Sequence, residues 1–196
     1  MKIRPVVLEG RHVRLEPLSL AHLDRLSEVG LEPELWKFTP GRVLSRSDMQ
    51  RYIEEALARQ RDGVALPFAT VDKSENAAVG STRYESISRE NHRVEIGWTW
   101  IAPPWQRSVV NTEAKYLMLT HAFETLSCVR VELKTDALNE RSRAAIKRIG
   151  AREEGILRKH LLMPEGRYRD TAYYSILDSE WDDVKAALEA KLNAKR

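Results

Sequence analysis

The stretch Trp98-Thr-Trp-Ile-Ala-Pro-Pro-Trp-Gln-Arg-Ser-Val-Val-Asn-Thr-Glu-Ala-Lys115 joins a predicted strand to the most regular helical pattern in this chain. The strand is expected to stop at the double proline, and the helix to open at Asn111 or Thr112. The first N–H groups of a helix have no partner inside the helix, and the helix dipole makes that end positive. The stretch therefore predicts a loop that attracts phosphate.

The segments on both sides of this stretch alternate between strand and helix patterns. Period-two alternation predicts strands at 13–18, 65–71, 78–86, 93–101, 129–135, 155–163 and 167–177. Apolar residues at helical spacing predict helices at 19–29, 45–61, 112–126, 139–148 and about 180–192, whereas 32–41 should be a loop. We therefore expect one mixed α/β domain over residues 1–196, antiparallel in its first half and with a strand–helix–strand crossover in its second.

Composition excludes several classes of protein. An apolar fraction of 42% and a charged fraction of 31% are typical of a soluble globular domain. The single cysteine, Cys128, excludes an internal disulfide, and the scattered histidines have no metal-ligand spacing, so no metal is expected. A net charge of +3 is too small for a dedicated nucleic-acid binder. Neither a signal peptide nor a long apolar run is found, which predicts a cytoplasmic protein without a membrane partner.

Four local patterns occur in a fixed order along the chain. They are the entry LEGRHVRLEPL at 8–18, the strand VEIGW at 94–98, the loop and helix at 105–115, and the segment NERS at 139–142 followed by AIKRIGA at 145–151. Together they resemble the Gcn5-related N-acetyltransferase (GNAT) superfamily, and more closely its branch of ribosomal-protein alanine acetyltransferases. The resemblance implies a central, mostly antiparallel twisted sheet flanked by helices, with two central strands splayed apart.

The same resemblance implies a function. Members of this superfamily transfer an acetyl group from acetyl-coenzyme A (acetyl-CoA) to an amine. The acceptor here would be a protein N-terminus or a small-molecule amine. In this branch the late hairpin, which includes 166–174, often shapes the acceptor pocket or a dimer contact, so the resemblance also allows a homodimer. The alternative is that 166–174 is a plain strand of the sheet without either role.

The resemblance assigns acetyl-CoA binding to three segments. The backbone of Trp100 and Ile101 would pair with the pantetheine arm. The loop and first helical turn would bind the pyrophosphate, through Gln106, Arg107, Ser108, Val109, Val110, Asn111 and Thr112. Asn139 and Ser142 would contact the pantetheine and the thioester, and Arg143 or Lys147 the 3′-phosphate. Arg107 can equally be a solvated surface charge.

Val109 departs from the family pattern, which usually has glycine at this position. A β-branched residue resists positive φ, and its side chain stands where the backbone must approach phosphate. Either the path of this loop avoids positive φ, or cofactor binding is weakened. The alternative function is therefore a non-catalytic acyl-CoA-binding or interaction module with a degenerate loop.

Direct attack of an amine on a thioester needs a base for the amine and a proton for the departing thiolate. Glu95 could accept the amine proton, directly or through water; otherwise it is a strand carboxylate paired with Arg83 or Arg93. By resemblance Ser142 would donate to the sulfur. The structural alternative is that Asn139 caps the helix and Ser142 is a neutral first-turn residue, and both roles can hold at once.

The acceptor pocket is predicted from aromatic residues. Tyr84 is a second candidate proton donor or a pocket wall, with a plain core position as the alternative. Trp36 and Phe38, on the segment 32–41, would line the same pocket, or else plug the core beneath that segment.

Overall fold

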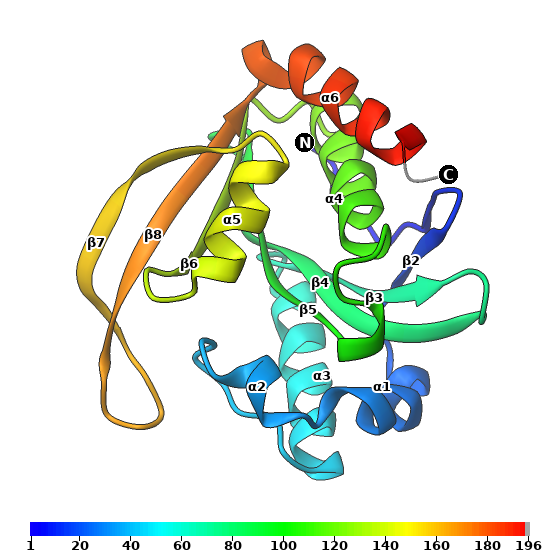
Figure 1. The fold of residues 1–196 in the computed structure, drawn as a ribbon, viewed down its shortest axis with the longest axis vertical. Helices are drawn as coiled ribbons and strands as arrows, with labels where there is room; N and C mark the ends of the chain where they lie inside the picture. Colours follow the sequence, from blue (N-terminus) through cyan, green and yellow to red (C-terminus); the bar gives the residue numbers. More distant parts are fainter. Residues whose placement is uncertain (195–196) are drawn as a thin grey trace.

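The computed structural model describes residues 1–194, in which eight strands form one twisted sheet (Figure 1). The strands are β1 (Leu8–Glu9), β2 (Val13–Pro17), β3 (Leu66–Asp72), β4 (Ala77–Ser88), β5 (Arg93–Ile101), β6 (Arg130–Asp136), β7 (Arg152–Leu162) and β8 (Tyr168–Leu177). Their order across the sheet is β1-β2-β3-β4-β5-β6-β8-β7. Only the pair β5–β6 is parallel; the other neighbours are antiparallel. The expected mixed α/β architecture with a mostly antiparallel sheet is confirmed.

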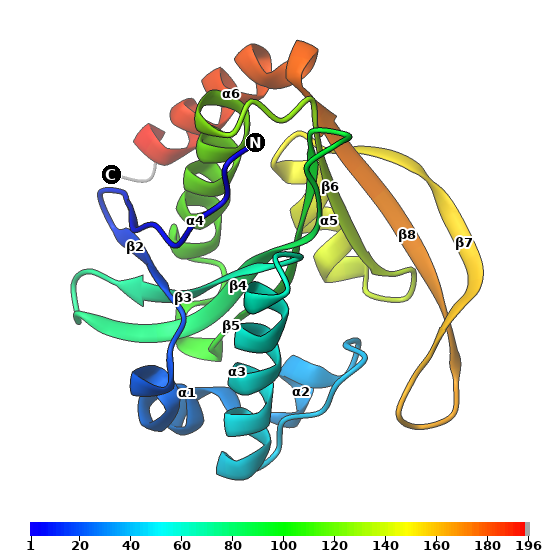
Figure 2. The same cartoon turned by 180° about the vertical axis from the view of Figure 1, so that it is seen from behind.

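Helices cover both faces of the sheet (Figures 1 and 2). They are α1 (Leu23–Gly30), α2 (Pro33–Trp36), α3 (Arg46–Arg61), α4 (Val110–Thr120), α5 (Glu140–Arg148) and α6 (Trp181–Ala194). The larger apolar cluster joins α4, α5 and α6 to one face of the sheet. The smaller cluster packs α1, α2 and α3 against the opposite face of the first strands. Burial of both apolar faces is what holds the layers together.

Two predicted elements differ from those observed. The segment 32–41 contains a short helix, because Pro33 at its first position presets a helical φ. The helix predicted at 112–126 begins at Val110 and ends at Thr120, after which the chain continues as a π-helical turn, His121–Thr125. The C-terminal helix, Trp181–Ala194, lies where it was expected.

The central strands β5 and β6 part after a short paired stretch. They pair only at Arg93–Arg130, Val94–Val131 and Glu95–Glu132. Beyond Glu95, β5 stays with β4, and beyond Glu132, β6 stays with β8. Both views show the two strands diverging from that point (Figures 1 and 2). The splayed central strands implied by the family resemblance are therefore present.

A β-bulge interrupts β5 within the diverging part. Ser81 pairs with Trp100 and Arg83 with Gly97, so Thr82 alone opposes both Trp98 and Thr99. Trp98 has a φ of 50°, which is uncommon for a bulky residue. A bulge bends the strand and re-aims its backbone groups, often beside an active site. The bulge thus marks the open edge of β5 as a place where backbone groups can meet a ligand.

Glu113 fastens the N-terminal hairpin to α4. Its side chain is buried, and its carboxylate accepts hydrogen bonds from the backbone N–H groups of Arg11, His12 and Val13 at 2.9, 2.7 and 2.6 Å. Such a cluster of charge-assisted bonds fixes the position of the hairpin relative to the start of α4.

Candidate active site

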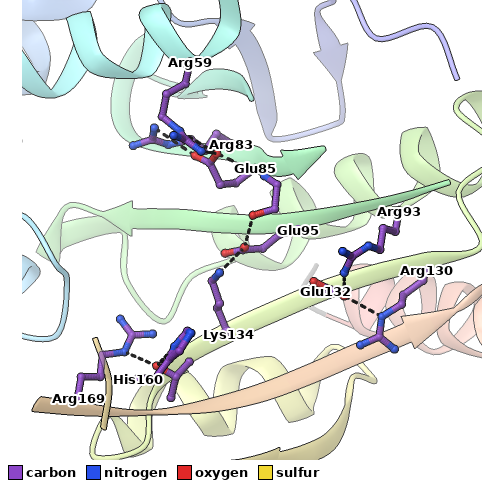
Figure 3. Close-up of polar contacts among 12 residues, drawn as sticks. Arg59, Arg83, Glu85, Arg93, Glu95, Arg130, Glu132, Lys134, His160 and Arg169 are labelled. Atoms are coloured by element: carbon purple, nitrogen blue, oxygen red, sulfur yellow. Dashed lines mark hydrogen bonds and ion pairs between the residues drawn. The ribbon is translucent and has the colours of Figure 1, made fainter. Parts of the chain in front are cut away.

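Glu95 lies where β5 and β6 part, and its side chain is only 3% exposed. The Nζ of Lys134 forms an ion pair with Glu95 Oε2 at 2.7 Å, and the Ser86 hydroxyl donates to the same oxygen at 3.1 Å (Figure 3). The partners proposed from sequence were wrong: Arg83 pairs with Glu85 and Arg93 with Glu132. The true partner comes from β6, which sequence proximity could not reveal.

Lys134 keeps a fixed positive charge beside Glu95. Burial opposes that charge, but the Glu95 carboxylate outweighs burial through its charge and hydrogen bond, and the pKa of Lys134 is raised. The lysine is therefore protonated at neutral pH, and the narrow end of the splay holds a buried carboxylate next to a cation.

The loop before α4 follows a path that Val109 tolerates. Val109 has φ −70° and ψ −24°, an ordinary helical conformation. The positive φ of this loop, 60°, belongs to Arg107, whose side chain is exposed and has no ion-pair partner within residues 1–194. Ser108 shapes the turn, because its hydroxyl donates to Trp105 O at 2.6 Å and accepts from Val110 N at 3.2 Å. Of the two outcomes open from the sequence, the loop that avoids positive φ at Val109 is the one observed.

Gln106 braces the loop from within. Its backbone N–H donates to Pro103 O at 3.1 Å, and its side-chain amide donates to Ile101 O at 2.8 Å. Arg141 Nη1 donates to its Oε1 at 2.9 Å. These bonds do not fit the predicted role of Gln106 as a direct phosphate ligand, since its polar groups are already engaged. The carbonyl of Ile101 is likewise occupied, so only the rest of the β5 edge can serve a ligand.

The basic residues of α5 that face the loop are not those expected. Arg143 donates to Tyr174 and Glu153, and Lys147 pairs with Glu153 at 2.8 Å, so both cations are directed toward β7 and β8 and not toward the loop. Arg141 instead contacts Gln106, and Arg148 Nη2 lies 3.5 Å from Thr112 Oγ1 at the start of α4. Residues seven apart share a helix face, so the spacing of Arg141 and Arg148 was the signal that the sequence offered.

Asn139 caps the N-terminus of α5, which is the structural role that the sequence allowed for it. Its Oδ1 accepts from Ser142 N at 3.0 Å, which satisfies one of the first N–H groups of that helix. The Ser142 hydroxyl is half-buried and makes no side-chain hydrogen bond within residues 1–194. This hydroxyl is therefore an unused donor in the first turn of α5.

Two of the three aromatic candidates lie in the core. Tyr84 is fully buried, and its hydroxyl donates to Met118 O at 2.5 Å, so it cannot line a pocket or reach a thiolate. Trp36 is 3% exposed and donates from its Nε1 to Gly30 O at 2.8 Å. Both assignments are corrected to core positions. Phe38 is half-buried, so its predicted role as a pocket wall stays a prediction.

The described residues contain neither a candidate metal site nor a candidate membrane span. Within residues 1–194 there is no group of three or more histidine, cysteine, aspartate or glutamate side chains that could hold a metal ion. No helix in that same range is long and apolar enough to cross a membrane.

Comparison with known proteins agrees with this geometry. Residues 12–152 match the acetyltransferase (GNAT) domain. A Bacillus subtilis (strain 168) protein named "Putative ribosomal N-acetyltransferase YdaF" is 37% identical over 106 residues, which span 54% of this chain and 57% of that protein. The crystal structure of a GCN5-related N-acetyltransferase from Brucella melitensis is 34% identical, covers 98% of this chain and 87% of its own, and superposes with a TM-score of 0.90.

A more distant structure has the same fold. The ribosomal-protein-S5-alanine acetyltransferase from Vibrio fischeri is 19% identical, with 90% of this chain and 98% of that chain covered and a TM-score of 0.74. The similarity to YdaF supports the ribosomal-protein branch that the four sequence patterns indicated. The match to the domain family spans most of the chain, and the protein therefore belongs to the GNAT acetyltransferase family.

Proposed function

We propose that this protein transfers an acetyl group from acetyl-CoA to a primary amine in the cytoplasm, by direct attack in a ternary complex. The acceptor is a protein N-terminus or a small-molecule amine. The observation that carries the proposal is the parting of β5 from β6 with Glu95 at its narrow end. The bulged edge of β5 and the start of α4 follow directly in sequence.

The residues at the start of α4 suit a pyrophosphate. The first N–H groups of α4 have no acceptor inside the helix, and the dipole favours an anion there. The guanidinium of Arg107 is exposed beside them, and Arg141 and Arg148 approach from α5. Because Val109 is helical, the main reason for inferring a degenerate, non-catalytic loop is removed.

The chemistry needs few groups from the protein. Acetyl-CoA supplies an activated acyl group as a thioester. Glu95 accepts the proton of the attacking amine, directly or through water, while Lys134 holds its carboxylate in place at 2.7 Å. Ser142, with its unused hydroxyl, donates a hydrogen bond to the sulfur as charge develops there. The backbone around Trp98–Ile101 would hold the pantetheine arm.

Calorimetric titration with acetyl-CoA tests the binding half of the proposal. The native protein should bind with a micromolar dissociation constant. Val109→Gly should bind no more tightly, because glycine adds flexibility without relieving any strain at φ −70°. No binding to the native protein, with binding gained in Val109→Gly, would overturn the proposal and restore the degenerate-loop alternative.

Turnover of two matched variants tests the base. Glu95→Gln should lower kcat by about 10²–10⁴-fold and leave acetyl-CoA affinity largely intact. Glu85→Gln is the control, because Glu85 is Glu95's cross-strand partner, is also buried, and is held by Arg59 at 2.9 Å. If both variants lose the same activity, or neither does, Glu95 is not the base.

A further inference from the structure

Arg169 on β8 is a buried arginine without a carboxylate partner. Only 5% of it is exposed. Its Nε donates to Thr171 Oγ1 at 3.1 Å, and its Nη1 lies 3.4 Å from Phe38 O. Within residues 1–194, no carboxylate lies in ion-pair distance of its guanidinium, although such a group has five donors and a full charge. A buried charge of this kind is costly unless something pairs with it.

The nearby carboxylates are already paired with other cations. Asp136 forms an ion pair with Arg167 at 2.6 Å, and Glu95 with Lys134 at 2.7 Å. Burial lowers the pKa of Arg169, and the charges of Asp136 and Glu95 only partly oppose that effect. The positive charge of Arg169 is thus left over once the internal pairs are counted.

The surroundings of Arg169 are polar and positively charged. His160 lies 3.1 Å from Thr171 Oγ1, the same hydroxyl that Arg169 contacts (Figure 3). Burial first, and then the charges of Lys134 and Arg169, lower the pKa of His160, so its imidazole is neutral at pH 7. The backbone of Lys134 on β6 pairs with Tyr173 of the neighbouring β8, and its side chain extends to Glu95 of β5. The charges therefore change from negative at Glu95 to positive at Lys134 and Arg169.

This sequence of charges fits a molecule that has both an amine and a carboxylate. An amine beside Glu95 of β5 can pass its proton to that carboxylate, and an anionic group of the same molecule could pair with Arg169 of β8, whose charge has no internal partner. A guanidinium binds a carboxylate through two parallel hydrogen bonds, which a lysine cannot reproduce. The half-buried Phe38 lies beside the guanidinium of Arg169, which its carbonyl oxygen contacts.

We propose that Arg169 binds a carboxylate of the acetyl acceptor, so that the substrate class is amines that also carry an acidic group. The proposal rests on the acetyl transfer proposed above and names the acceptor of that reaction. The carboxylate can belong to a free amino acid or to an acidic side chain near a peptide N-terminus. Both sources offer the same group to the guanidinium.

The test uses two matched pairs of amines with the full-length protein and acetyl-CoA. One pair is alanine and alaninamide; the other is the dipeptide amides Ala-Glu-NH2 and Ala-Gln-NH2. In the native protein, kcat/KM should favour the acidic member of one pair by about 10- to 100-fold, mainly through KM, as a charged hydrogen-bond pair predicts. The pair that shows the preference identifies the source of the carboxylate.

Variants of Arg169 separate binding from structural support. Arg169→Gln should raise KM for the acidic member of the pair to that of the neutral member, so that the preference disappears, while KM for the neutral member stays unchanged. Arg169→Lys should restore part of the preference. Arg152→Gln is the charge control, because Arg152 begins the same hairpin, and its side chain is 77% exposed and pairs with Glu180. That control should keep the native preference.

Several outcomes would overturn the inference. Equal use of the acidic and amide members by the native protein would do so, as would an Arg169→Gln variant that loses both equally. If Arg169→Gln does not fold, the native ratio and Arg169→Lys decide the matter. Transfer to none of the four amines, together with no binding of acetyl-CoA, would instead refute the proposed function itself.

Discussion

Replacing Lys115 by methionine should stabilise this protein at neutral pH. Lys115 lies on α4 and is 5% exposed. Its ammonium group donates to Thr82 Oγ1 at 3.1 Å and to Thr99 Oγ1 at 2.5 Å, and no carboxylate within residues 1–194 pairs with it. Burial lowers its pKa from 10.5 to about 7. The folded state therefore carries a lysine that disfavours its own charge.

The magnitude follows from that shift. A fall from 10.5 to about 7 corresponds to roughly 5 kcal/mol of unfavourable free energy when the lysine is protonated. The two threonine hydroxyls also bond to each other at 2.7 Å, so they keep a partner after the substitution. Methionine fills a similar volume without a charge. Allowing for imperfect repacking, we expect the free energy of unfolding at pH 7 to rise by about 2–4 kcal/mol.

The pH dependence gives the stricter test. The unfolded chain keeps the lysine proton up to about pH 10.5, whereas the folded chain loses it near pH 7, so native stability rises between these values. Methionine binds no proton, so the advantage of Lys115→Met should be complete below pH 7 and shrink as the pH rises toward 10. Urea unfolding at pH 6, 7, 8 and 9 measures both trends.

The control for this experiment is Lys37→Met. The side chain of Lys37 is 56% exposed, pairs with Glu34 at the surface and lies over the Phe38 ring at 5.8 Å. Such exposed contacts contribute little, so the free energy of unfolding of Lys37→Met should differ from that of the native protein by less than about 0.5 kcal/mol at each pH. The reasoning is refuted if Lys115→Met destabilises the protein throughout this range, or if its advantage does not shrink with pH.

Three further substitutions have defined outcomes. A Cβ on Gly97 would lie 2.7 Å from Glu95 Oε1 and would force that carboxylate to move. Gly97→Ala should therefore lower kcat, while calorimetry should show that acetyl-CoA binding is retained. Unchanged turnover would contradict this. Glu113→Gln should lower the free energy of unfolding, measured with urea, by about 2–3 kcal/mol, because three N–H donors lose an ionised acceptor. The control is Glu189→Gln, which should lower it little, because Glu189 is more exposed and accepts a side-chain hydrogen bond from Tyr116 alone among the described residues. Arg107→Asn removes the cation but keeps a residue type that tolerates a φ of 60°. The affinity for acetyl-CoA should fall about 3- to 10-fold and become less dependent on salt concentration. An unchanged affinity would show that Arg107 is a plain surface charge.

Most of the architecture could be predicted from local sequence patterns. Apolar alternation and helical spacing located the long strands and helices to within a few residues, because burial of one face requires those periods. The exception is the helix predicted to end at 126, which ends at Thr120 and continues as a π-helical turn. The double proline and the residues after it marked the end of β5 and the start of α4. The conformation of the loop could not be predicted in the same way. The family pattern placed the position that needs glycine at Val109, whereas the positive φ falls on Arg107.

The pairing of charges depended on strands that are distant in sequence. Glu95 was placed correctly on β5, but its partner Lys134 is supplied by the register of β6. Arg143 was expected at a phosphate and instead pairs with Glu153 of β7. Ion pairs form between side chains that the sheet brings together, and periodicity alone does not specify the partner.

The sequence by itself determined the order of elements, the family resemblance and the candidate base, because these depend on periodicity and on short motifs within one segment. Only the tertiary structure decided that Tyr84 and Trp36 belong to the core and that the strands part beside Glu95. It alone left Arg169 buried without a carboxylate. Burial and charge balance are properties of neighbours in space, and those neighbours come from the whole sheet.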